Sequence, residues 1–183
     1  MMENLEQIAA DEIKRLSSLK IKKFREKYSQ FLIEGEHLIE EAVNSDFYQN
    51  IIYIIVRNDY SGGDFLDMLS NFKIYRASSK AFDRISGTEN PQGIAALLKK
   101  PDTEFAFDSD IITVLDNVND PGNAGTIIRT CYWFDVKQVI LGNNSVDLYN
   151  PKTVRATQGA LFNILAKETE DLKTEIDALE SSG

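Results

Sequence analysis

The stretch from Ile111 to Arg129 limits what this chain can fold into more than any other part of it. The apolar run from Ile111 to Leu115 is typical of a buried strand, and it breaks into a loop rich in Asn, Asp, Pro and Gly. A helix is predicted from about Gly122. Open α/β sheets bind ligands outside the carboxyl ends of their strands and beside helix N-termini. The sequence therefore predicts an α/β domain with a polar site in the loop 117–123.

The rest of the second half continues this alternation. The pattern predicts helix 122–134, strand 138–141, helix 151–159, strand 161–165 and helix 170–180. Strands and helices that alternate at this spacing indicate parallel βαβ construction. Three parallel strands make a small sheet, and the last predicted helix leads to no further strand. We therefore expect the domain at 111–183 to be incomplete, short by one or two βα units of about 30 to 60 residues in total.

The first half also alternates, which predicts a small α/β domain over residues 1–100. Residues 3–19 have apolar side chains at helical spacing, and Ser78 or Ser79 can cap a helix that ends at Ile85. The acidic, aperiodic segment 101–110 is interpreted as a linker. The other expected elements of this half are strands at 30–34, 51–56 (central and covered on both faces), 73–76 and 94–98, and helices at 36–43 and 65–69.

Composition narrows the class of protein. The chain is 43% hydrophobic and 27% charged, and no apolar run approaches the length of about 18 residues that a membrane span needs. Its N-terminus lacks the apolar core of a secretory signal, so a cytoplasmic protein is expected. With a single cysteine, Cys131, and a single histidine, His37, we expect no disulfide and no metal site. We assign neither residue any chemistry.

Charge is distributed unevenly along the chain. The net charge of -9 argues against indiscriminate nucleic-acid binding. Between Lys14 and Lys27, however, lie seven basic residues and one acid, Glu26. The run is either a solvated helix end or an arm that contacts phosphates.

The helix after the central loop has two distinct faces. Arg129 falls nearly opposite the apolar stripe, on the same side as Gly125. Because helical side chains lean toward the N-terminus, we expect Arg129 to reach across a bare Gly125 toward the loop, where Asn123 is expected to cap the helix. Such a site suits a phosphate or another oxyanion. The alternative, which spacing alone favours, is a capped helix with an exposed arginine. The stripe expected to pack on the sheet comprises Ala124, Ile127, Ile128, Cys131 and Phe134.

Trp133 lies off this stripe. It either packs against another domain or a partner subunit, or is a partly exposed aromatic residue.

The segment from Asn117 to Arg129 resembles the first motif of the SpoU (TrmH-like) RNA 2′-O-ribose methyltransferases of the knotted SPOUT superfamily. That motif has an Asn followed six residues later by an Arg, here Asn123 and Arg129. The segment from Asp147 to Phe162, which includes Arg155 and Gly159, is similar to the family's next segment.

The first half is similar to the L30e-like substrate-binding domain that precedes many SpoU catalytic domains. Phe31 to Glu36 and Pro91 to Ile94 carry this likeness. The resemblance implies an L30e-like α/β domain followed by an incomplete SPOUT domain, an α/β knot with a Rossmann-like parallel sheet. A homodimer is implied for the full-length parent.

The resemblance implies methyl transfer from S-adenosylmethionine (AdoMet) to a ribose 2′-oxygen in rRNA or tRNA, with Asn123 and Arg129 as catalytic residues. The family role of Arg129 is to activate the hydroxyl. Because a guanidinium is a poor base, we expect Arg129 to be a cation that stabilises the developing alkoxide and holds a phosphate. The basic run then favours RNA contact, and the RNA-binding residues implied are Lys22, Lys23, Arg25 and Arg155.

Two later motifs of the family, a Gly-Asn-Glu-Gly loop and a Pro-Met to Ser-Leu-Asn-Val segment, do not occur in residues 1–183. In the family they build the knot and hold the methyl donor. The resemblance therefore implies no AdoMet-binding residue here and an inactive chain unless the remainder is supplied. The alternatives are a non-catalytic RNA-binding module and a domain that binds a small phosphorylated ligand at 117–123.

Overall fold

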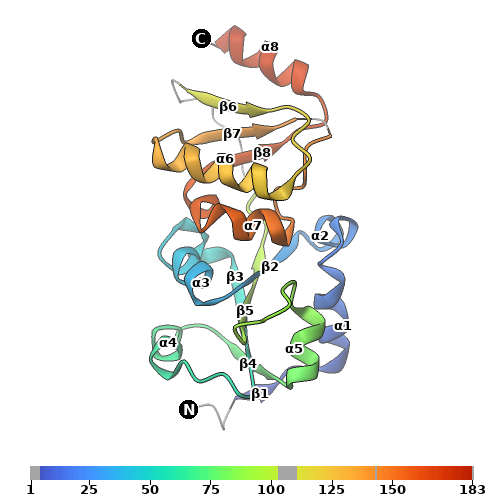
Figure 1. Cartoon of the computed structure of the whole chain (residues 1–183), viewed down its shortest axis with the longest axis vertical. Helices are drawn as coiled ribbons and strands as arrows, with labels where there is room; N and C mark the ends of the chain where they lie inside the picture. Colours follow the sequence, from blue (N-terminus) through green and yellow to red (C-terminus); the bar gives the residue numbers. More distant parts are fainter. Residues whose placement is uncertain (1–4, 103–110, 143, 183) are drawn as a thin grey trace. The chain divides into compact units, whose positions relative to one another are not determined.

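The computed structural model describes residues 5–102, 111–142 and 144–182 (Figure 1). The chain divides into two compact units, Met1–Pro101 and Asp102–Gly183, which we call unit 1 and unit 2. Most of the predicted linker, 101–110, lies outside the described residues. No helix in the described part of the chain is long and apolar enough to cross a membrane.

Unit 1 is built on a mixed five-stranded sheet. The strand order is β1 (Glu6–Gln7), β4 (Ile74–Ala77), β3 (Ile51–Arg57), β5 (Ile94–Lys99) and β2 (Gln30–Glu34). β1, β4 and β3 are parallel, whereas β5 runs antiparallel to both β3 and β2. β3 lies in the middle, and its residues Ile54 to Val56 are fully buried, which confirms the prediction of a central strand covered on both faces.

Helices cover both faces of this sheet. Figure 1 shows α1 (Ala10–Ser18) and α5 (Ser79–Ile85) on one side, and α3 (Glu36–Val43) and α4 (Gly63–Met68) on the other. Leu16 and Phe82 belong to the core beneath α1 and α5. The remaining elements are α2 (Lys22–Tyr28) and the 3₁₀ helix η2 (Asp46–Asn50).

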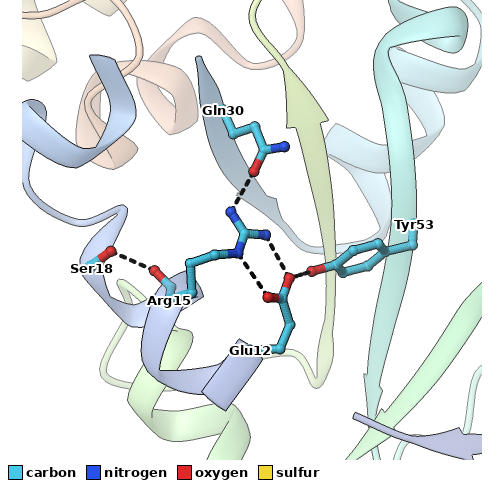
Figure 2. A network of polar contacts seen from close by, with 5 residues as sticks. All are labelled: Glu12, Arg15, Ser18, Gln30 and Tyr53. Atoms are coloured by element: carbon cyan, nitrogen blue, oxygen red, sulfur yellow. Dashed lines mark hydrogen bonds and ion pairs between the residues drawn. The ribbon is translucent and has the colours of Figure 1, made fainter. Parts of the chain in front are cut away.

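A polar network fastens α1 to the sheet (Figure 2). Arg15 donates to both carboxylate oxygens of Glu12 at 2.7 and 2.5 Å, and to Gln30 Oε1 on β2 at 2.6 Å. The Tyr53 hydroxyl on β3 donates to the same Glu12 carboxylate. Burial and this hydrogen bond raise the Tyr53 pKa, while the Arg15 hydrogen bond lowers the Glu12 pKa.

One predicted element of unit 1 is wrong at its start. The apolar spacing predicts a helix through residues 3–19, but Glu6–Gln7 form β1 and the helix begins only at Ala10. The Ile8 N–H donates to the Arg76 carbonyl at 2.9 Å, and Ile8 is buried. Pairing with the edge of the sheet buries Ile8 and satisfies its backbone, so the helical spacing of Leu5 and Ile8 does not decide the local structure.

Unit 2 contains a parallel three-stranded sheet in the order β6 (Ile112–Leu115), β7 (Gln138–Leu141) and β8 (Leu165–Glu168). This confirms the predicted parallel construction. The prediction of a buried strand at 111–115 is wrong, because β6 is an outer strand of the described sheet and Val114 is 38% exposed. α6 (Pro121–Trp133) connects β6 to β7. The remaining elements are α7 (Pro151–Thr157), the 3₁₀ helix η3 (Ala160–Asn163) and α8 (Leu172–Ser182).

The strand predicted at 161–165 is displaced in the structure. Residues Ala160–Asn163 form η3, and the strand begins at Leu165, whose N–H donates to the Lys137 carbonyl at 2.9 Å. Gln158 and Gly159 both have positive φ, which ends α7 and turns the chain. The apolar run therefore buries its side chains as a 3₁₀ turn before it enters the sheet.

Candidate functional site

The loop after β6 is held against the turn after β7. The Ser145 hydroxyl donates to the Leu115 carbonyl at 3.1 Å and accepts from the Val118 N–H at 3.2 Å. The Val146 N–H donates to the Val118 carbonyl at 2.9 Å. Asn117 has a φ of 57°, in the left-handed region that Asn tolerates better than most residues. The predicted polar loop is thus a defined structure at the carboxyl end of β6.

Asp120, not Asn123, caps α6. The Asp120 Oδ1 accepts from the Asn123 N–H at 2.7 Å, and Pro121 is the first helical residue. Proline suits that position because its φ is fixed near the helical value and its missing N–H would have no partner there. The prediction of Asn123 as the cap is therefore wrong. Asn123 lies in the first turn of α6 and its side chain is exposed.

The prediction that Arg129 reaches across a bare Gly125 is also wrong. Gly125 is buried against α7, where an added Cβ would lie 2.4 Å from the Ala156 Cβ and 2.7 Å from the Thr153 carbonyl oxygen. The absence of a side chain at Gly125 serves close helix packing instead.

Arg129 is exposed on α6, as is Asn123. Six residues of an α-helix correspond to about 9 Å of rise and about 120° of net rotation. Within the described parts of the chain, no hydrogen bond or ion pair joins Arg129 to Asn123 or to a carboxylate. Both motif residues thus face solvent from the helix that follows the loop.

Most of the predicted apolar stripe of α6 is confirmed. Ala124, Ile128 and Cys131 are buried, but Phe134 is 78% exposed. The helix ends at Trp133, so helical phase does not apply to Phe134. Trp133 is 75% exposed.

The four predicted RNA-binding residues have different environments. Lys22 and Lys23 are exposed on α2, where Lys22 forms an ion pair with Glu26 at 3.7 Å. Arg25 is only 2% exposed, and its Nη1 donates to the Leu19 carbonyl at 2.6 Å. A side chain this buried offers little surface to a phosphate, so we expect Arg25 to act as a structural residue of unit 1. Arg155 is half-buried on α7.

Sequence reasoning missed how the two motifs of unit 1 are joined. The Glu34 carboxylate accepts from the Ser86 hydroxyl at 2.7 Å and from the Gly87 N–H. The Gln92 Oε1 accepts from the Glu36 N–H at 3.2 Å. Segments 31–36 and 91–94 therefore lie side by side. Ser86 gives no signal in the sequence, whereas an Asp directly before a helix-starting Pro, as at Asp120, is a recognisable cap.

Comparisons with known proteins agree with this arrangement. Residues 10–96 match the family described as MRM3-like substrate binding domain, and residues 110–183 match the SpoU rRNA Methylase family. The chain is 35% identical over 182 residues to the 23S rRNA (guanosine(2553)-2′-O)-methyltransferase RlmP of Bacillus subtilis, which covers 100% of this chain and 71% of that protein. The chain belongs to the SpoU rRNA methylase family.

Two further proteins are similar to this chain. Human mitochondrial rRNA methyltransferase 3 is 30% identical over 163 residues, which covers 82% of this chain and 39% of that protein. Among solved structures, a TrmH-family protein from Porphyromonas gingivalis has a TM-score of 0.83 at 27% identity and covers 97% of this chain and 69% of its own.

The fold is also that of AviRb from Streptomyces viridochromogenes, a SpoU methyltransferase whose structure holds AdoMet. Its TM-score is 0.79 at 20% identity, with 95% of this chain and 68% of AviRb covered. The family resemblance and the fold class expected from the sequence are confirmed.

Proposed function

We propose that this chain provides the substrate-binding domain and part of the catalytic domain of an rRNA 2′-O-ribose methyltransferase whose donor is AdoMet. The observation that carries the proposal is the exposure of Asn123 and Arg129 on α6, directly after the carboxyl end of β6. The chain that places them is 35% identical to RlmP along its whole length.

Arg129 acts as a fixed cation in this proposal. Its guanidinium stabilises negative charge that develops on the 2′-oxygen and holds a neighbouring phosphate. It does not act as a base, because an arginine stays protonated at physiological pH. The Asn123 amide can both donate and accept, so it suits the ribose or phosphate oxygens beside that cation.

Unit 1 contacts the RNA backbone through α2. Lys22 and Lys23 are exposed there and are the proposed phosphate contacts, together with Arg155 of unit 2. Contacts of this kind orient RNA without reading its sequence, so the choice of nucleotide needs other interactions.

The described residues of unit 2 do not form a complete binding site for AdoMet. At the carboxyl edge of the sheet, Ser145 bonds Val118 and Leu115, and the Glu168 carboxylate accepts from the Leu148 N–H at 3.3 Å. Leu172 covers the end of β7, with its Cδ2 2.6 Å from where a Cβ of Gly142 would be. We therefore assign AdoMet to no described residue, and we propose that residues 1–183 alone do not transfer a methyl group.

Tritium transfer tests the proposal. The protein expressed from the complete reading frame is incubated with [methyl-³H]AdoMet and rRNA from cells that lack the gene. We expect label in alkali-resistant dinucleotides, because a 2′-O-methyl group blocks attack by that oxygen on the adjacent phosphate. Label on a base would contradict the proposal, as would full activity of Arg129→Ala.

A second candidate function is a non-catalytic RNA-binding module. The exposed Lys22 and Lys23 of α2 favour it, since they offer phosphate contacts in unit 1 that do not depend on the motif residues of unit 2. This function predicts that the complete protein binds rRNA in a filter-binding assay but transfers no label in the tritium assay. The predicted homodimer of the parent stays a prediction, which light scattering on that protein can check.

A further inference from the structure

We propose that Ser145 is a positioning residue for methyl transfer: its hydroxyl sets the shape of the loop that leads into Asn123 and Arg129. This inference rests on the proposed function. Ser145 lies in the turn after β7 and belongs to neither the predicted cap nor the motif pair.

The hydroxyl connects two loops at the carboxyl edge of the sheet. It donates to the carbonyl of Leu115, the last residue of β6, at 3.1 Å and accepts from the Val118 N–H at 3.2 Å. The chain between Leu115 and Val118 therefore curves around one oxygen atom. The left-handed φ of 57° at Asn117 lies within this curve.

Backbone hydrogen bonds also join these two loops, but they do not take over the role of the Ser145 hydroxyl. The Leu115 carbonyl also accepts from the Gly142 N–H at 2.8 Å, and the Val118 carbonyl accepts from the Val146 N–H at 2.9 Å. Without the hydroxyl, the Leu115 carbonyl would still accept from the Gly142 N–H, but the Val118 N–H would lose Ser145 as its acceptor. Val118 is thus the backbone position whose geometry depends on Ser145.

Val118 stands two residues before the cap of α6. From the cap, the chain enters Pro121 and then presents Asn123 and Arg129 from one rigid helix. A displacement at Val118 shifts the start of α6, and Asn123 in the first turn is affected most because Gly125 is packed against α7. Misplacement of catalytic groups by about 1 Å can reduce a rate by about 100-fold, so one hydroxyl can matter for turnover without touching the substrate.

The experiment uses the protein from the complete reading frame, with Ser145→Ala, Ser145→Thr, Arg129→Ala and a matched control, Ser181→Ala. The Ser181 hydroxyl is exposed and bonds only the Asp177 carbonyl of its own helix, at 2.7 Å, among the contacts of described residues. The rate constant kcat and KM for rRNA are measured by tritium transfer. Exchange of the Val118 amide is followed by NMR in the 183-residue chain.

We expect Ser145→Ala to lower kcat by about tenfold or more with KM for rRNA nearly unchanged. Exchange of the Val118 amide should accelerate, Ser145→Thr should restore most of kcat, and Ser181→Ala should match the wild type. The inference would be overturned by a normal kcat in Ser145→Ala or by Val118 amide exchange in that variant as slow as in the wild type. A kcat of Ser145→Thr as low as that of Ser145→Ala would also overturn it. Full activity of Arg129→Ala would instead refute the proposed function.

Discussion

Gly125 of α6 and Ala156 of α7 are packed so closely that a Cβ added to Gly125 would lie 2.4 Å from the Ala156 Cβ. The Thr153 carbonyl would be 2.7 Å from the same added atom, so backbone as well as side chain would have to move. This contact fixes α6 against α7, and α6 is the helix that presents Asn123 and Arg129.

Gly125→Ala should therefore destabilise the protein. Overpacking of a tight core typically costs about 1–3 kcal/mol, and we expect a loss in that range in urea unfolding followed by circular dichroism. Gly63→Ala is the matched control, because an added Cβ there has no atom within 4 Å beyond its neighbours in the chain and the backbone of its own helix. Equal stability of Gly125→Ala and wild type would show that the helices are not packed as described.

The cap of α6 gives a second prediction. Asp120→Ala should cost about 1 kcal/mol of unfolding free energy, whereas Asp120→Asn, which keeps an acceptor, should cost less. Asn123→Ala should change stability by no more than about 0.5 kcal/mol, since its side chain is exposed and caps nothing. If Asn123→Ala proved the more destabilising, Asn123 would be the cap after all.

The Glu12 network predicts a dependence of stability on pH. The Arg15 hydrogen bond lowers the Glu12 pKa from its ordinary value of 4.5. Because the folded-state pKa is depressed, the stabilisation is complete above pH 4.5 and is lost as the pH falls through the lowered pKa. Glu12→Gln should thus be less stable than wild type by about 1 kcal/mol at pH 7.

That difference should shrink as urea unfolding is repeated at successively lower pH below 4.5. Glu6→Gln is the control, because the Glu6–Lys73 ion pair is exposed and such pairs contribute little. A Glu12→Gln deficit that is the same at every pH would contradict the role of the carboxylate charge.

Substitutions of the basic residues of α2 should have different effects: those at Lys22 and Lys23 on rRNA binding, and that at Arg25 on stability. Replacement of both Lys22 and Lys23 by Ala should lower the slope of log Kd against log salt for rRNA binding by about 1.5. Arg25→Ala should instead lower stability, because a buried acceptor, the Leu19 carbonyl, loses its donor. Filter binding at four salt concentrations checks both variants. An Arg25→Ala slope as low as that of the double variant would restore Arg25 to the RNA contacts.

Periodicity and turn chemistry predicted the fold class, because the apolar strand runs 51–56 and 111–115 and the turns between elements are local patterns. What sequence could not show were contacts between distant residues. Ile8 pairs with the edge of the sheet at Arg76, and Gly125 meets Ala156, so the spacing of Leu5 and Ile8 and the bareness of Gly125 were both misleading.

For the candidate site, the motif is the basis for proposing Asn123 and Arg129, and the charge run is the basis for proposing Lys22 and Lys23. The burial of Arg25 results from tertiary packing, and the basic residues around it in the sequence do not indicate it. The role inferred for Ser145 depends on its contact with Val118, which is 27 residues away in the sequence. No local sequence pattern therefore indicates it.

The most direct test of the methyltransferase proposal is a map of 2′-O-methylation across rRNA from cells in which the gene is deleted. We expect that one ribose loses its methyl group, that the wild-type gene restores it, and that an Arg129→Ala allele does not, although the variant protein accumulates normally. An unchanged methylation map after deletion, or full restoration by the Arg129→Ala allele, would contradict the proposal.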